Sequence, residues 1–272
     1  MPQSMAQDRR CPVVSLVSTK GGVGKTTLAY ALATEVARRL TIATNRQSPR
    51  AVAPWRGKVT CIDADPNRTL SQVLHLTNDT RIVCVESDSE RLLPDLRAAQ
   101  ASSDLVLIDL EGTANQAMLY AAGKSDLVLV PAQPSRFDVV EAVKTIGVVR
   151  KAADLVDRDI AHRVVLSRTP VLRQRVVDHS RTQFVRAGLP LLPVELVQRT
   201  AFQSMTYNGQ PPYRQDGGEA AAANVTHLTD AVLAIIGLNL PSGQPASPEH
   251  ANTAAAVLSS QPSRLQVVEA TA

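Results

Sequence analysis

The sequence predicts an α/β fold in which a mostly parallel, twisted sheet carries helices on both faces. Short apolar runs rich in Val, Ile and Leu alternate along the chain with longer segments of helical pattern, and such alternation is typical of βαβ units. The apolar runs are nearly continuous, which is typical of strands that are covered on both faces. A chain of 272 residues is long enough for one such domain.

The elements follow one another in a regular order. The first strand is expected over residues 12–18, with the sequence PVVSLVS, and a helix over 25–40 follows it after a glycine-rich turn. Further strands are expected over 57–63, 81–86, 104–110, 125–132, 162–169 and 189–195. Helical patterns lie near 67–75, 88–101, 113–123, 135–153, 171–187 and 217–236. In such sheets ligands bind outside the carboxyl ends of the strands.

Some segments do not fit this alternation of strands and helices. Residues 41–56 hold two prolines and several polar or basic residues, and we expect an extended surface loop there, with room for a short strand at its start. Residues 241–272 are rich in Pro, Ser and Ala and lack aromatics, which predicts a disordered tail. Residues 1–11 are a short polar N-terminus without the apolar core of a signal peptide. The expected domain is therefore 12–240.

Composition excludes several classes of protein. No apolar run approaches the ~20 residues that a membrane span needs, so we expect a cytoplasmic protein. Cys11, Cys61 and Cys84 are odd in number and far apart, a pattern that suits neither a disulfide framework nor a zinc or iron–sulfur site. We interpret them as small apolar residues.

The stretch STKGGVGKTT, residues 18–27, joins the first strand to the first helix. A strand, a glycine-rich turn and a helix form the context that makes a phosphate-binding loop credible, because backbone N–H groups and the positive end of the helix dipole converge on phosphate oxygens. Lys25 would contact the β- and γ-phosphates of ATP and Thr26 would bind Mg²⁺. The strict pattern GxxxxGK(S/T) fails, since Thr19 stands where it requires glycine. The predicted nucleotide-binding residues are Lys20, Gly21, Gly22, Val23, Gly24, Lys25, Thr26 and Thr27.

This loop resembles the deviant Walker A box of the ParA/MinD group of P-loop ATPases, which have a P-loop NTPase fold. In that group the extra lysine, at the position of Lys20, reaches across a nucleotide-sandwich homodimer to the phosphates of the partner. The resemblance therefore implies that Lys20 is catalytic in trans, as an arginine finger is, and that ATP controls dimerisation. A solvated loop lysine is the alternative for Lys20.

Two acidic segments extend the resemblance. CIDADPNRT, residues 61–69, is similar to the second box of the group, in which Asp63 would hold the Mg²⁺ shell and Asp65 would orient or activate the attacking water. A cap of the following helix is the alternative for Asp65. LVLIDLEG, residues 105–112, resembles a Walker B strand, with Asp109 emerging where Mg²⁺ would sit. Glu111 and Gly112 depart from the Pro-rich sequence often found there, and we assign Glu111 no catalytic role.

The resemblance covers roughly residues 12–236. Residues 126–146 are similar to the next strand and long helix of the group, and residues 191–212 to the region that packs against adenine. The chain resembles the short ParA type, which leaves site-specific DNA binding to a separate protein, and also resembles ATPases of T-DNA transfer. The 41–56 insertion is longer than the usual link and brings Arg46, Arg50, Arg56 and the adjoining Lys58, so an extra nucleic-acid contact is the alternative to a plain surface loop.

Arginine dominates the region 160–214. It holds no lysine and two acids, Asp178 and Glu195, beside eight arginines at 163, 168, 173, 175, 181, 186, 199 and 214. Such asymmetry suggests a polyanionic partner, and without base-reading motifs the expected partner is nonspecific double-stranded DNA bound through its backbone. The predicted DNA contacts are Arg173, Arg175, Arg181 and Arg199, the last at the start of an expected helix. Solvated faces or salt bridges are the alternative.

The sequence also narrows the choice within the group. The last residues, SRLQVVEATA, lack the basic amphipathic helix of membrane-positioning relatives. No cysteine lies within 109–137, where iron–sulfur ligands of nitrogenase-reductase relatives would be expected. We expect a DNA partition ATPase with ATP and Mg²⁺ as cofactors, acting at the nucleoid and stimulated by a centromere-binding, ParB-like protein. The alternatives are an ATP-gated adaptor that recruits DNA-transfer machinery and a metabolic ATPase or ligase.

Overall fold

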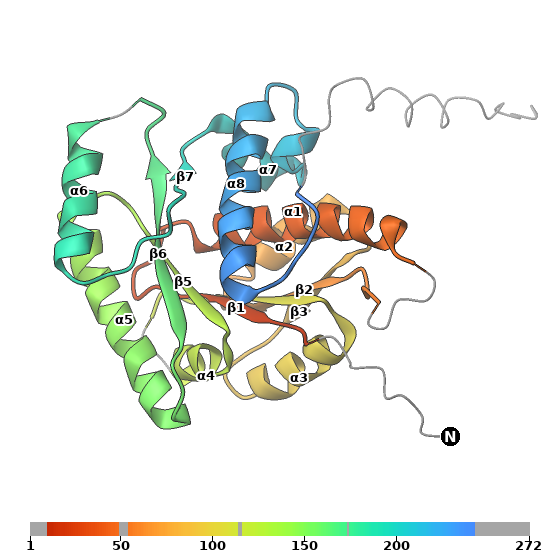
Figure 1. Cartoon of the computed structure of the whole chain (residues 1–272), viewed down its shortest axis with the longest axis horizontal. Coiled ribbons are helices and arrows are strands. Elements are labelled where there is room, and N and C mark those ends of the chain that lie inside the picture. Colours follow the sequence, from red (N-terminus) through yellow and green to blue (C-terminus); the bar gives the residue numbers. More distant parts are fainter. Residues whose placement is uncertain (1–9, 49–53, 114–115, 173, 243–272) are drawn as a thin grey trace, which may run out of the picture.

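Seven parallel strands of the described chain form one sheet at the centre of the molecule. The structure, a computed structural model, describes residues 10–48, 54–113, 116–172 and 174–242. The strand order is β3-β2-β4-β1-β5-β6-β7, and every neighbouring pair is parallel (Figure 1). The strands are β1 (Val13–Leu16), β2 (Val59–Ala64), β3 (Ile82–Glu86), β4 (Leu105–Leu110), β5 (Leu127–Ala132), β6 (Ala161–Thr169) and β7 (Leu196–Val197). This arrangement confirms the predicted α/β fold.

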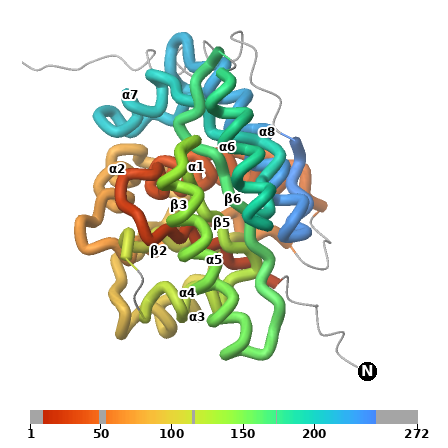
Figure 2. The backbone as a smooth tube through the Cα atoms, turned by 90° about the vertical axis from the view of Figure 1, so that its left-hand side faces the viewer, coloured from red at the N-terminus to blue at the C-terminus, as the bar shows by residue number. Residues whose placement is uncertain are grey.

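Helices cover both faces of the sheet. They are α1 (Lys25–Arg46), α2 (Thr69–Thr77), α3 (Leu92–Ser102), α4 (Gln116–Lys124), α5 (Arg136–Val156), α6 (Arg175–Arg186), α7 (Thr200–Asn208) and α8 (Glu219–Ile236), with a 3₁₀ turn at Pro212–Arg214. Helices α1, α2, α7 and α8 bury their apolar sides in one core, and α3, α4, α5 and α6 bury theirs in the other. Figure 2 shows α7 above α2, on the same side of the sheet as α1 and α8. No described helix is both long and apolar enough to cross a bilayer.

The strands supply side chains to the two cores in turn. On β1, Val14 packs into the core under α1, while Val13 packs into the core on the opposite face. Leu107 and Ile108 divide in the same way on β4. Successive side chains of a strand point to opposite faces, so a strand that is covered on both sides is apolar at most positions, which is the pattern that the sequence shows.

The register of the central strands places three chain segments side by side. Asp63 on β2 pairs with Asp109 on β4, and Asp109 pairs with Leu16 at the end of β1. Because all strands are parallel, their carboxyl ends meet at one edge of the sheet. The loop after β1 and the acidic ends of β2 and β4 therefore converge there.

The segment after residue 40 differs from the prediction. Helix α1 continues to Arg46 instead of giving way to a loop. Ala43 is buried, and the Thr44 hydroxyl donates to the Leu40 carbonyl at 2.8 Å, so both residues fit the helix despite the weak helical pattern. Residues 47–48 and 54–58 are irregular, and residues 49–53, which include Arg50, lie outside the described residues.

The strand expected over 189–195 was also misplaced. Only an isolated bridge from Leu191 to Val164 forms there within the described chain, and the regular pairing starts at β7. Pro190 and Pro193 interrupt this run, and proline lacks the N–H that a strand ladder needs. The run is therefore a connection that buries Leu189 and Leu192 rather than a strand.

A buried ionic cluster joins α8 to α1. Arg39 is 1% exposed and donates to Glu35 at 2.8 Å and to the Thr226 carbonyl at 2.9 Å. Arg39 also forms an ion pair with Asp230 at 2.5 Å, and Glu35 forms a further ion pair with Arg38 at 2.7 Å. A buried guanidinium must have such partners, since an unpaired buried charge is costly.

Replacing Arg39 with Met should lower the free energy of unfolding by about 3 kcal/mol, because it leaves the Glu35 carboxylate short of a partner in a buried place. Urea unfolding measures the change. Arg46→Met is the matched control, since Arg46 is exposed at the end of the same helix, and it should change stability by less than about 0.5 kcal/mol. Similar effects of the two substitutions would contradict a structural role for the cluster.

Candidate nucleotide-binding site

The loop between β1 and α1 forms one wall of a cavity of about 430 Å³. Gly22 has φ 74° and Gly24, the residue that precedes α1, has φ 96°. Glycine adopts these left-handed angles without the strain that a Cβ would bring. The 22-residue helix α1 then starts directly at the cavity, which favours an anion at that place.

The cavity collects residues from four strand ends. Those that line it are Gly21, Gly22, Gly24, Lys25, Thr26, Thr27, Asp65, Asn67, Thr69, Glu111, Gly112, Thr113 and Arg168. Lys25 is 7% exposed, and burial lowers the pKa of its ammonium group, an effect that the nearby Asp109 carboxylate opposes. Six of the eight residues predicted to bind nucleotide thus line the cavity, while Lys20 and Val23 lie elsewhere. Val23 is buried under the loop.

Thr26 and Asp109 form the part of the site that fits a metal ion. The Thr26 hydroxyl donates to Asp109 Oδ2 at 2.7 Å, and Asp109 is 1% exposed. Its second oxygen, Oδ1, is buried and has no hydrogen-bond partner among the described residues. Burial raises the pKa of Asp109 to about 7, although Thr26 and Lys25 oppose the shift. Carboxylate and hydroxyl oxygens are the ligands that Mg²⁺ prefers, so these two residues fit the ion.

Asp109→Asn should stabilise the protein when Mg²⁺ and nucleotide are absent. The folded-state pKa of Asp109, about 7, lies above its ordinary value of 3.8, so the ionised carboxylate destabilises the fold above pH 7, and this cost fades as the pH falls toward 4. We expect the variant to gain about 2 to 4 kcal/mol in free energy of unfolding at pH 8 and much less near pH 4.5.

Urea unfolding at the two pH values measures this difference. With Mg²⁺ and ATP present the order should reverse, because the amide is a poorer ligand for the ion than the carboxylate. A gain that is equal at both pH values would show that the buried charge is not its cause.

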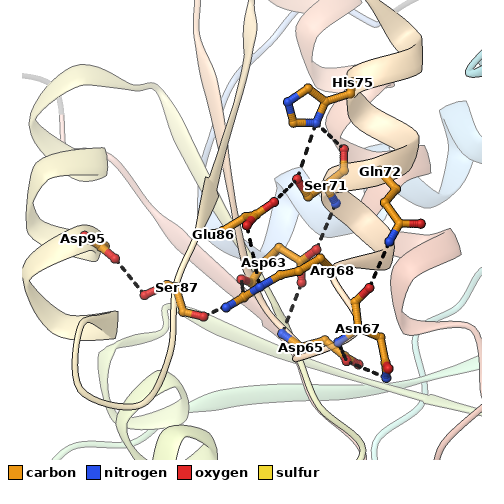
Figure 3. A network of polar contacts seen from close by, with 10 residues as sticks. All are labelled: Asp63, Asp65, Asn67, Arg68, Ser71, Gln72, His75, Glu86, Ser87 and Asp95. Atoms are coloured by element: carbon orange, nitrogen blue, oxygen red, sulfur yellow. Dashed lines mark hydrogen bonds and ion pairs between the residues drawn. The ribbon is translucent and has the colours of Figure 1, made fainter.

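Asp63 organises the loop that follows β2 (Figure 3). It is fully buried, its Oδ1 accepts the Asp65 N–H at 3.1 Å, and its Oδ2 accepts the Ser71 N–H at 2.9 Å. Burial raises the pKa of Asp63, and these two N–H groups oppose the shift. Both oxygens thus hold backbone in place, and a contact with Mg²⁺ stays a prediction.

Arg68 fastens the same loop to the end of β3 (Figure 3). Its guanidinium donates to the Asp63 carbonyl and, at 2.6 Å, to the Ser87 carbonyl. Asp65 is held from within the loop, since its Oδ1 accepts the Asn67 N–H at 2.9 Å. The arrangement keeps Asp65 at the wall of the cavity. Arg68 was not among the predicted site residues, because nothing in a lone arginine of a polar loop indicates which carbonyls it reaches.

Lys20 points to α5. Its ammonium group donates to Asp138 Oδ2 at 2.8 Å, and its side chain is 38% exposed. Asp138 is fixed in turn by Ser135, which caps α5. Burial raises the pKa of Asp138, but the hydrogen bonds from Lys20 and Ser135 outweigh this and lower it below its ordinary value. No sequence motif indicated a role for Asp138 in the site, because it is distant from the loop along the chain.

Gly112 lets the loop after β4 touch the phosphate loop. A Cβ on Gly112 would lie 2.9 Å from the Gly21 nitrogen and 3.1 Å from the Lys20 carbonyl carbon. The first distance is shorter than real Cβ contacts, so a side chain would force the two backbones apart. This close approach explains why a glycine stands at a position where the sequence departs from the expected proline-rich pattern.

Gly112→Ala should weaken ATP binding by about tenfold, because the displaced phosphate loop no longer presents its N–H groups in the right geometry. Calorimetric titration with ATP measures the change. Gly147→Ala is the matched control, since a Cβ there meets nothing within 4 Å in the middle of α5, and ATP affinity should stay the same. Equal affinities of the two variants would show that the contact at Gly112 does not shape the site.

A second cavity, of about 190 Å³, adjoins the first. The two share Gly24, Thr27 and Arg168. Its other lining residues are Ser167, Leu196, Val197, Gln198, Arg199, Phe202 and Gln203. Apolar and amide side chains beside a phosphate cavity suit a nucleotide base, and the location agrees with the predicted adenine region.

Three of the four predicted DNA contacts fall within the described residues, and their surroundings differ. Arg175 is exposed at the start of α6, and Arg181 is exposed but donates to Glu195 at 2.7 Å. Arg199 is half-buried at the second cavity, and its Nε has no hydrogen-bond partner among the described residues. Arg173 lies outside the described residues. Of the three that the structure describes, Arg175 and Arg181 thus lie on α6 and Arg199 precedes α7.

Comparison with known proteins finds relatives in sequence and in fold. Protein ParA of Rhizobium radiobacter is 27% identical over 197 residues, which cover 71% of this chain and 82% of that protein. Protein virC1 of the same species is 26% identical over 207 residues, which cover 72% and 81%. An ATP complex of a Cyanothece McdA variant matches with a TM-score of 0.65 at 16% identity, covering 86% of this chain and 99% of that one. This last likeness shows the fold alone.

A parallel sheet with a two-lysine phosphate loop after its central strand is the architecture of P-loop ATPases of the ParA/MinD type, and this chain is one of them. Within that class the chain belongs to the VirC1 protein family, whose model matches residues 12–211. The predicted resemblance to ParA/MinD-type ATPases is therefore confirmed.

Proposed function

We propose that the protein is a DNA partition ATPase that dimerises on ATP, binds nonspecific double-stranded DNA as a dimer and releases it after hydrolysis. The observation that carries the proposal is the position of Lys20. It is part of the phosphate loop, yet it is partly exposed and turned to Asp138 on α5 instead of lining its own cavity. A lysine in that place is free to reach the phosphates of a second copy once Asp138 releases it.

The chemistry of hydrolysis follows from the cavity. Lys25 would bind the β- and γ-phosphates, Thr26 and Asp109 would hold Mg²⁺, and Asp65, which also lines the cavity, would orient the attacking water. The ion, when bound, neutralises charge on the phosphate oxygens. Lys20 of the partner subunit adds the positive charge that the transition state needs, so the site is complete only in the dimer.

DNA binding rests on the excess of arginine between residues 160 and 214. Arg175 is exposed and open to a phosphate contact, while Arg181 must first part from Glu195. Contacts of this kind neutralise phosphates without reading bases. The proposed place of action is the nucleoid in the cytoplasm, with a ParB-like, centromere-binding protein as the partner that stimulates hydrolysis.

A second function is favoured by a specific observation. The matching family model is that of VirC1 protein, and virC1 and ParA of one species are almost equally identical to this chain. The same ATP-driven dimer could recruit a DNA-transfer complex to its origin. That adaptor would bind the transfer proteins in its ATP form, whereas a partition ATPase would bind a centromere complex.

DNA binding in the three nucleotide states tests the proposal. A random-sequence duplex at fixed, moderate salt should bind with ATP and Mg²⁺, and at least tenfold more weakly with ADP or without nucleotide. Lys20→Ala should bind ATP but lose the ATP-dependent DNA binding, and its steady-state hydrolysis should fall by about 10³-fold, as for loss of an arginine finger. Fluorescence anisotropy and phosphate release measure the two effects.

Lys124→Ala serves as the control variant. Lys124 is exposed at the end of α4, just before β5 begins and so at the edge of the sheet opposite the cavity, and its loss should leave both measurements unchanged. Full hydrolysis by Lys20→Ala would refute the trans role. DNA binding in no nucleotide state would refute partition and leave a protein adaptor.

A further inference from the structure

Arg168 occupies a bulge near the end of β6. The pairing of β6 with β7 is irregular there, because Ser167 pairs with Leu196 and Thr169 pairs with Val197, which leaves Arg168 without a partner residue in the ladder. Its φ is 53°, in the left-handed region that non-glycine residues avoid. The other non-glycine residues of the described chain with positive φ, namely Arg68, Asn78 and Asp157, each flank the end of a helix. Arg168 does not, so its backbone conformation calls for a different cause.

The neighbours of Arg168 fix this conformation from both sides. Ser167 is fully buried and its hydroxyl donates to the Val23 carbonyl in the phosphate loop at 2.7 Å. The Thr169 carbonyl accepts the Gln198 N–H at 2.7 Å. With both neighbours held inward, the side chain between them is exposed. Bulges of this kind re-aim one side chain and are common beside active sites, and strained residues persist where a function depends on them.

The bulge places Arg168 where the two cavities meet. It lines the phosphate cavity together with Lys25 and Thr26, and it lines the smaller cavity together with Phe202. In a nucleotide that spans both cavities, the group at the junction is the phosphate next to the ribose. A guanidinium binds phosphate with charge-assisted, often bidentate hydrogen bonds.

We propose that Arg168 binds the α-phosphate of the nucleotide and that the strained bulge of β6 exists to hold it there. The inference rests on the proposed nucleotide site and adds a residue to it. It assigns different phosphates to different basic residues: Lys25 and Lys20 act on the β- and γ-phosphates, and Arg168 acts on the phosphate that ATP, ADP and AMP have in common.

Arg168→Gly tests the proposal, because it should raise the stability of the protein and lower its affinity for nucleotide. Glycine accepts a φ of 53° without strain, so the urea midpoint of the nucleotide-free protein should rise. The affinities for ATP, ADP and AMP should each fall by about tenfold, the loss of one charge-assisted contact, whereas adenosine binding should change little. Calorimetric titration with the four ligands measures the affinities.

Asp157→Gly is the matched control. Asp157 has φ 47° at the end of α5 and lines neither cavity, so glycine there should raise the urea midpoint in the same way and leave all four affinities unchanged. Arg168→Lys should retain part of the affinity because it keeps the charge.

Three results would overturn the inference. Unchanged ATP affinity of Arg168→Gly would remove Arg168 from the site, and an equal loss for adenosine would place it on the base. A loss that grows from AMP to ATP would place it on the terminal phosphates. Failure of the unaltered protein to bind ATP would instead refute the proposed function itself, so the two failures are distinguishable.

Discussion

The parallel register of β1, β2 and β4 is the constraint on which the site depends. It sets Asp63, Asp109 and the last residue of β1 side by side across the sheet. A shift of one residue would turn these side chains to the opposite face and bury the apolar residues of each strand in the wrong core. The apolar cores on the two faces therefore fix the register, and the register fixes the position of the carboxylates relative to the phosphate loop.

The loops at this edge are held by backbone-directed hydrogen bonds rather than by packing. Asp63 holds the loop after β2, Ser167 ties the end of β6 to the phosphate loop, and Gly112 allows backbone to rest on backbone. Apolar side chains are too few in such loops to order them, whereas each hydrogen bond to a buried partner is costly to leave unmade. The cavity is thus preorganised before any ligand enters, whereas the ammonium group of Lys20 is held outside it by Asp138.

Much of this could be predicted from the sequence. Continuous apolar runs located six of the seven strands, and the loop sequence located Lys25, Thr26 and the glycines, because these signals are local in the chain. The extension of α1 to Arg46 was missed because it depends on tertiary contacts. The short β7 was missed because prolines interrupt the apolar run before it. Asp138, Arg68 and Arg168 were missed as site residues for a related reason. Their importance comes from carbonyls, carboxylates and a bulge that only the folded chain brings near them.

The ionic cluster around Arg39 has a consequence for what counts as the minimal folded unit. The family model ends at residue 211, whereas α8 starts at Glu219. Yet α8 buries Val225, Leu228 and Val232 in the core that α1 also lines, and Arg39 of α1 reaches both Thr226 and Asp230. Helix α1, which begins at the phosphate loop, therefore packs against a helix that lies beyond the part matched by the family model. A fragment that ends at residue 211 would keep the phosphate loop but would lose the contacts by which α8 supports α1.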